Sequence, residues 1–195
     1  MTIARRGRSL AVSGFLLGGA VGIISSTQSW LTVQRADSAS EILVPGASAL
    51  PLLAPLSLAV LALGAALSIT GRVLRYVFAV LAAAVAVLLG WSTLQLLVAP
   101  GIPAVASTVT EVTGLAGRTA LEGVIASIAP SPWPAIALAG WFVLLLAAVV
   151  VLATGGRWTR GGRRYRTDAA AASSSGPVDA VDSWDELSRG TDPTR

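Results

Sequence analysis

The chain has 195 residues, of which 54% are hydrophobic and only 12% are charged. Soluble domains carry about 25% charged residues, so a large water-soluble core is excluded. Cysteine and histidine are absent, which removes disulfides, thiolate nucleophiles, imidazole bases and the common transition-metal ligand sets. The sequence therefore predicts no metal site, no cofactor and no enzymatic activity.

Four apolar stretches follow one another along the chain, at residues 9–27, 51–69, 73–98 and 134–153. A helix needs about 20 apolar residues to cross the hydrocarbon core of a bilayer, and each stretch is close to this length or longer. Arg75 lies just inside the third stretch, and no other Asp, Glu, Arg, Lys or His falls in any of them. The predicted fold is an all-α membrane protein, a bundle of four transmembrane helices.

The arginines predict the orientation of this bundle, because all fourteen basic residues are arginine and they are unevenly placed. Ten lie near span ends in residues 1–8, in the turn 70–72 with the helix start that follows it, and in 154–195, whereas the loops 28–50 and 99–133 hold two. The positive-inside rule then puts both termini in the cytoplasm and both loops outside an inner membrane. We assign the net charge of +4 to topology and anionic lipid headgroups rather than to nucleic acid.

The first stretch carries Gly14, Gly18 and Gly22 at four-residue spacing, which places them on one helix face. Glycines at such positions let another helix backbone approach closely. The face is either a homo-oligomer seam or a packing surface within one bundle, and we favour the second interpretation. The short turn at residues 70–72 predicts that the second and third helices are antiparallel neighbours.

The outside loop 99–133 has apolar residues at helical spacing, interrupted by Gly114 and Gly117. The pattern predicts one or two amphipathic helices that lie on the outer membrane surface or cap the bundle. A lid over a pocket is the alternative interpretation.

Two tryptophans lie inside the stretches rather than at their ends. Trp91 and Trp141 are each seven residues from the outer end of a predicted helix, roughly 10 Å below the outer boundary. Gln95 is one turn from Trp91 on the same helix face. These residues predict either a pocket for a flat, partly polar molecule or two packing tryptophans with Gln95 bonded to a neighbouring helix. Trp30 is expected at the membrane interface.

A basic segment follows the fourth stretch and predicts a topology anchor that also binds anionic lipid headgroups. Its members are Arg157, Trp158, Arg160, Arg163, Arg164 and Tyr165. Residues 169–177 are rich in Ala, Ser, Gly and Pro, which predicts a flexible, disordered linker in the cytoplasmic tail.

The end of the chain carries the residues of a family resemblance. The run from Trp184 to Thr194 reads W-D-E-L-S-R-G-T-D-P-T, and Arg157-Trp158 and Arg164-Tyr165 precede it. In this, the chain resembles the actinobacterial tryptophan-biosynthesis-associated membrane proteins, with an R-W…R-Y motif after the last helix and a terminal W-D-x-L-x-x-G-x-D-P-T motif. The resemblance implies four spans and brings no catalytic residues.

The resemblance also sharpens the interpretation of the tail as a peptide ligand for a cytoplasmic protein. Trp184 and Leu187 would be its apolar anchors, and Asp192 with Pro193 its turn. The predicted function is an accessory or scaffold role that recruits a partner, for example a tryptophan-pathway enzyme. The alternatives are an incidental tail, and binding or transport of an aromatic metabolite through Trp91, Gln95 and Trp141.

Overall fold

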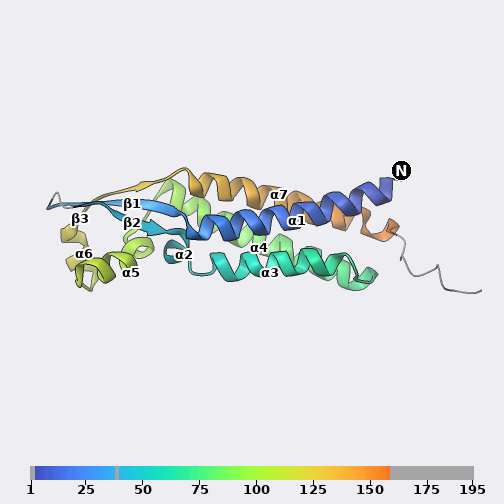
Figure 1. The fold of residues 1–195 in the computed structure, drawn as a ribbon, viewed down its shortest axis with the longest axis horizontal. Helices are drawn as coiled ribbons and strands as arrows, with labels where there is room; N and C mark the ends of the chain where they lie inside the picture. Colours follow the sequence, from blue (N-terminus) through green and yellow to red (C-terminus); the bar gives the residue numbers. More distant parts are fainter. Residues whose placement is uncertain (1–2, 38–39, 159–195) are drawn as a thin grey trace, which may run out of the picture. The chain divides into compact units, whose positions relative to one another are not determined.

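Long apolar helices dominate the residues that the computed structural model describes, 3–37 and 40–158. In an apolar environment a helix satisfies its backbone hydrogen bonds internally, which favours this conformation for such runs. Three of the helices contain segments long and apolar enough to cross a membrane: Gly7–Thr27, Arg72–Val98 and Trp133–Thr154. A fourth apolar helix has 15 residues. The four are α1 (Ile3–Thr27), α3 (Leu53–Leu67), α4 (Arg72–Val98) and α7 (Trp133–Thr154), shown in Figure 1.

Small residues allow these helices to pack closely. Helix α7 packs against both α1 and α4, and α1 also packs against α3. A Cβ atom added at Gly14 would lie 2.5 Å from Ala147 Cβ, and one added at Gly18 would lie 3.0 Å from Leu144 Cβ. Helices α3 and α4 follow each other in the chain but contact each other only slightly. The expected close pairing of the second and third helices is therefore weak, because α3 packs mainly on α1.

A three-stranded antiparallel sheet follows the first helix, so the all-α prediction is wrong for this part of the chain. The strands are β1 (Ser29–Arg35), β2 (Ile42–Pro45) and β3 (Ile125–Pro130), in the order β2-β1-β3. Val33 of β1 lies opposite Ile42 on one side and Ile128 on the other. The central strand is rich in β-branched and aromatic residues, which favour extended backbone.

Short helices complete this part of the fold. They are α2 (Gly46–Ala49), α5 (Ile102–Thr113) and α6 (Arg118–Val124), and a 3₁₀ turn, η1 (Gly155–Arg157), follows α7. Helices α5 and α6 lie in the loop where amphipathic helices were expected, and Gly114 ends α5 in the left-handed conformation, with φ of 70°. Helix α5 buries Val105 and Val109 and packs on α2 and β2.

The side chain of Trp30, a residue of β1 that was expected at the membrane interface, lies in the core of the protein. Its side chain is fully buried, and its Nε1 donates hydrogen bonds of 2.9 Å to both the carbonyl oxygen and the hydroxyl of Ser25. A Cβ atom on Gly46 would lie 2.7 Å from the same Nε1. The indole therefore joins the end of α1 to the start of α2.

The described unit has two distinct ends, visible in Figure 1. At the first, the start of α1 and the start of α4 meet the ends of α3 and α7, through bonds from Arg8 to the Ser68 carbonyl and from Arg75 to the Gly155 carbonyl. We call this the arginine end. The sheet with α2, α5 and α6 lies at the opposite end, which we call the sheet end.

Large apolar side chains cover much of the outer surface between the two ends. Leu58 is 62% exposed, Val87 59% and Phe142 61%. Soluble monomers rarely expose large contiguous apolar patches. The helices therefore present a surface suited to lipid.

Candidate functional site

The arginine end is organised around Arg75, one turn into α4. Its side chain is 4% exposed, and its guanidinium donates hydrogen bonds to the carbonyls of Gly155, at 2.7 Å, and Thr70, at 3.2 Å. The last carbonyls of a helix lack intrahelical partners and carry partial negative charge, so they are favourable acceptors for a cation. Arg75 thus joins the start of α4 to the end of α7.

Trp158 lies against this arginine. The Arg75 Cζ atom is 4.7 Å from the centroid of the Trp158 ring, a distance at which the cation is attracted to the ring face. The indole Nε1 donates a 3.1 Å hydrogen bond to the Thr154 hydroxyl, and only 6% of the side chain is exposed. The sequence placed Trp158 in a lipid-binding anchor, whereas the structure packs it onto the helices.

Two further arginines bind backbone carbonyls at this end. Arg8 donates to Ser68, where α3 ends, and Arg72 donates to Gly156 at 2.8 Å. Within residues 3–37 and 40–158, the acidic side chains belong to the sheet end, at Asp37, Glu41, Glu111 and Glu122. The arginine end is therefore cationic and offers N–H donors, which suits it to anionic groups and to holding helix ends together.

The predicted aromatic pocket is not assembled. Trp141 is 2% exposed, and its Nε1 donates a 3.3 Å hydrogen bond to Thr93 of α4. A Cβ atom on Gly22 would lie 2.5 Å from Trp141 Cη2, so α1 packs directly on this ring. Trp91, in contrast, is 62% exposed. Trp141 belongs to the helix core and Trp91 to the outer surface.

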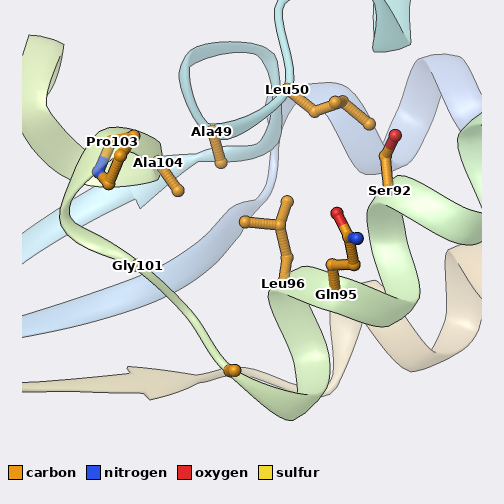
Figure 2. A pocket seen from close by; sticks show the side chains of 9 residues that line it. Ala49, Leu50, Ser92, Gln95, Leu96, Gly101, Pro103 and Ala104 are labelled. Carbon is orange, nitrogen blue, oxygen red and sulfur yellow. The ribbon is translucent and has the colours of Figure 1, made fainter.

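Gln95 lines a cavity that contains neither tryptophan. This cavity, of about 360 Å³, lies at the sheet end between α4, the segment before α3 and the start of α5. Figure 2 shows the side chains of Ser92, Gln95 and Leu96 directed from α4 towards Ala49 and Leu50. The lining residues are Ala49, Leu50, Ser92, Gln95, Leu96, Ala99, Gly101, Pro103 and Ala104.

A second cavity, of about 580 Å³, lies between α5 and α6. Its charged lining residue, Arg118, pairs with Glu122 at 2.9 Å. This i,i+4 pair is exposed. The lining residues are Gly101, Ile102, Pro103, Ala106, Ser107, Thr110, Gly117, Arg118 and Leu121.

Comparison with models of protein families identifies the family of this chain. The model of one family, described as tryptophan-associated transmembrane protein, matches residues 12–194. The chain belongs to this family. Comparisons with curated proteins and with solved structures find no match.

Membership in the tryptophan-associated transmembrane family confirms the resemblance carried by the tail and the transmembrane character predicted from the apolar stretches. The match includes the helices and extends through the terminal motif. The family description associates the protein with tryptophan and gives no reaction or partner.

Several residues predicted from the sequence lie outside the described residues. They are Arg160, Arg163, Arg164, Tyr165, Trp184, Leu187, Asp192 and Pro193. Of Arg157, the structure describes only the backbone, which belongs to η1. Of the predicted packing residues, Gly14 and Gly18 face α7, and Gly22 faces both α7 and Ser57 of α3, all within the same chain.

The sequence analysis did not predict that Arg75 joins the start of α4 to the end of α7. A signal was present, because an ionisable residue inside an apolar run is a candidate functional residue. Ser92 and Thr93 gave no comparable signal, since hydroxyl groups commonly bond to their own helix.

Proposed function

We propose that this protein is a non-enzymatic accessory protein of the membrane, which recruits a cytoplasmic partner of tryptophan metabolism through its tail, residues 178–195. The observation that carries this proposal is the fixed position of Trp158 at the point where the tail begins. Its burial, its bond to Thr154 and its contact with Arg75 attach the chain firmly to the helices. A firm attachment at this point supports a role for the residues that follow it in tethering a partner to the membrane protein.

The arginines of this end support an architectural role. Arg8, Arg72 and Arg75 each donate to a backbone carbonyl at the end of a helix. These hydrogen bonds hold α1 to the end of α3, and α4 to the end of α7. The terminal motif, with Trp184 and Leu187 three residues apart in the sequence, then supplies the apolar anchors for the partner.

The proposal includes four membrane crossings with both termini in the cytoplasm. Helix α3 has 15 residues and rises about 22 Å, less than the bilayer core of about 30 Å. It nevertheless connects the same two ends as the other three helices, because Arg8 at the start of α1 binds the Ser68 carbonyl at its end. Local thinning of the bilayer accommodates a short span at modest cost.

Crosslinking from the tail in living cells tests the recruitment. The full chain carries a photoreactive residue in place of Ser188, and crosslinked products are compared between the parent, Trp184→Ala and the matched control Val178→Ala. We expect a tryptophan-pathway enzyme in a product that Trp184→Ala loses and Val178→Ala keeps. If no such product depends on Trp184, recruitment through this motif is wrong.

Cysteine labelling tests the topology, since the natural chain contains no cysteine. Ala36→Cys and Ala126→Cys, both exposed at the sheet end, should react with a membrane-impermeant maleimide in intact cells. Ser173→Cys should react only after the membrane is permeabilised. Labelling of Ser173→Cys in intact cells would reverse the proposed orientation.

Binding or passage of an aromatic metabolite is the weaker function. This function requires the side chains of Trp91 and Trp141 to line one pocket, but Trp141 lies in the helix core and Trp91 on the surface. Uptake of labelled tryptophan by a deletion strain separates the two functions, because tail truncation should abolish recruitment and leave uptake unchanged.

A further inference from the structure

The cavity beside Gln95 follows from the way the four helices pack. Helices α3 and α4 contact each other only slightly, whereas α4 packs closely on α7 and α3 on α1. At the sheet end, Leu50 before α3, Ser92 on α4 and Pro103 of α5 all line the resulting cavity. Figure 2 shows these parts around a common space.

The cavity lining contains apolar side chains and two polar ones, Ser92 and Gln95. They are three residues apart on α4, so they lie on the same helix face. Neither side chain makes a hydrogen bond to another of the described residues, whereas the neighbouring Thr93 accepts one from Trp141. Gln95 is exposed, so its carboxamide is accessible to a molecule in the cavity.

The charge of this cavity restricts the molecule that it accepts. None of its lining residues is ionisable, so a carboxylate or an ammonium group would lose hydration without gaining a counter-charge. A volume of about 360 Å³ lies within the usual range for small-molecule sites, about 300–1,000 Å³. Leu52, two residues after the lining residue Leu50, and Trp91, next to Ser92, have apolar and exposed side chains. A molecule dissolved in the membrane therefore meets an apolar surface near the cavity.

We propose that this cavity binds an uncharged amphiphile, a molecule with an apolar body and a hydrogen-bonding group that pairs with Gln95 and Ser92. Two sources supply this chemistry. An indole ring has one N–H donor for the Gln95 carbonyl, and a diacylglycerol has a hydroxyl and ester carbonyls. The proposal does not depend on recruitment by the tail.

The test uses the full chain in nanodiscs with two probes. Binding of 5-fluoroindole is followed by ¹⁹F NMR, and binding of a diacylglycerol with a photoreactive acyl chain is followed by mapping the crosslinked peptides. We expect at least one probe to bind saturably, with the diacylglycerol crosslinks falling on residues 92–104. The probe that binds identifies the source of the ligand.

Two variants locate the binding. Ala99→Trp fills the cavity from an exposed position, and it should abolish saturable binding. Its matched control is Val98→Trp, at an exposed neighbour outside the lining, which should bind normally. Gln95→Leu keeps the volume and removes the amide, and it should weaken binding about tenfold, whereas Trp91→Leu should leave it unchanged.

Each of the following results either supports or overturns the proposal. Saturable binding that Ala99→Trp abolishes and Gln95→Leu weakens supports it, for whichever probe binds. Absence of saturable binding for both probes, or binding that neither variant changes, overturns it. Binding that is lost with Trp91→Leu but retained by Ala99→Trp would place the ligand on the outer surface of α4 and also overturn it.

Discussion

The two ends of the described unit are held together by different interactions. At the arginine end, the side chains of Arg8, Arg72 and Arg75 bind carbonyls at the ends of α3 and α7. At the sheet end, strands pair through their backbones and Trp30 lies in a fully buried core. The difference follows from charge placement, because the sequence concentrates arginine at one end and therefore leaves the other to backbone pairing and apolar burial.

The comparison predicts how each end responds to substitution. Charged side chains near water gain little from each bond, since water competes for the same groups. Burial of a large aromatic ring contributes more free energy, and its loss leaves a void that the surroundings fill only partly. Substitutions in the sheet core should therefore cost more stability than most of those at the arginine end.

Trp30→Ala should cause the largest loss. The substitution removes a fully buried indole and both hydrogen bonds to Ser25. We expect the free energy of unfolding to fall by about 4 kcal/mol, measured by SDS titration in mixed micelles. Leu43→Ala, at an exposed position of β2, is the control and should cost little. Equal losses for the two variants would show that the sheet end does not depend on its core.

Arg75→Leu should cause the next largest loss. It removes the hydrogen bonds to Gly155 and Thr70 and the contact with Trp158. Hydrogen bonds made by charged groups contribute about 1.5–3 kcal/mol each in favourable settings, and water near this end replaces part of that, so we expect a loss of about 3 kcal/mol. The same titration measures it.

Arg75→Lys is the informative companion variant. Lysine keeps the charge but lacks the planar fork that reaches two carbonyls at once. It should recover less than half of the loss. Full recovery would show that charge alone, and not bonding to both helix ends, determines the effect.

The long helices could be predicted from the sequence because their apolar runs are continuous. The stretches 73–98 and 134–153 agree with α4 and α7 to within one residue at each end. The sheet was harder to predict, since β2 has only four residues and β3 carries its isoleucines three residues apart, a helical spacing. Strand β3 adopts its conformation because it pairs with β1, a contact between residues about 95 apart in the chain.

The candidate sites show the same limit. Gln95 was identified from its polarity within an apolar helix. Of its expected partners, Trp141 is buried in the helix core and Trp91 is exposed on the outer surface. The slight contact between α3 and α4, beside which the cavity lies, occurs together with close glycine contacts of α1 with α7 and α3. Such contacts between helices leave no periodic pattern in the sequence of α4.

Trp158→Leu should have a smaller effect than either earlier substitution. It removes the cation–π contact with Arg75 and the bond to Thr154, which together should lower the free energy of unfolding by about 1–2 kcal/mol. Trp158→Phe keeps an aromatic face and should lose about half as much. If Phe is as destabilising as Leu, the bond to Thr154 and not the ring face accounts for the effect.

Arg72→Ala should have the smallest effect, although it removes a bond at the same end. Arg72 is exposed and donates one hydrogen bond, to the Gly156 carbonyl. Exposed substitutions of this kind usually change stability by about 0.5 kcal/mol or less. Arg118→Ala, which breaks an exposed ion pair with Glu122 at the sheet end, should match it in SDS titration. A loss near that of Arg75→Leu would mean that the arginines act as one unit, and the contrast between the two ends would then rest on cooperation among charges rather than on burial of Arg75.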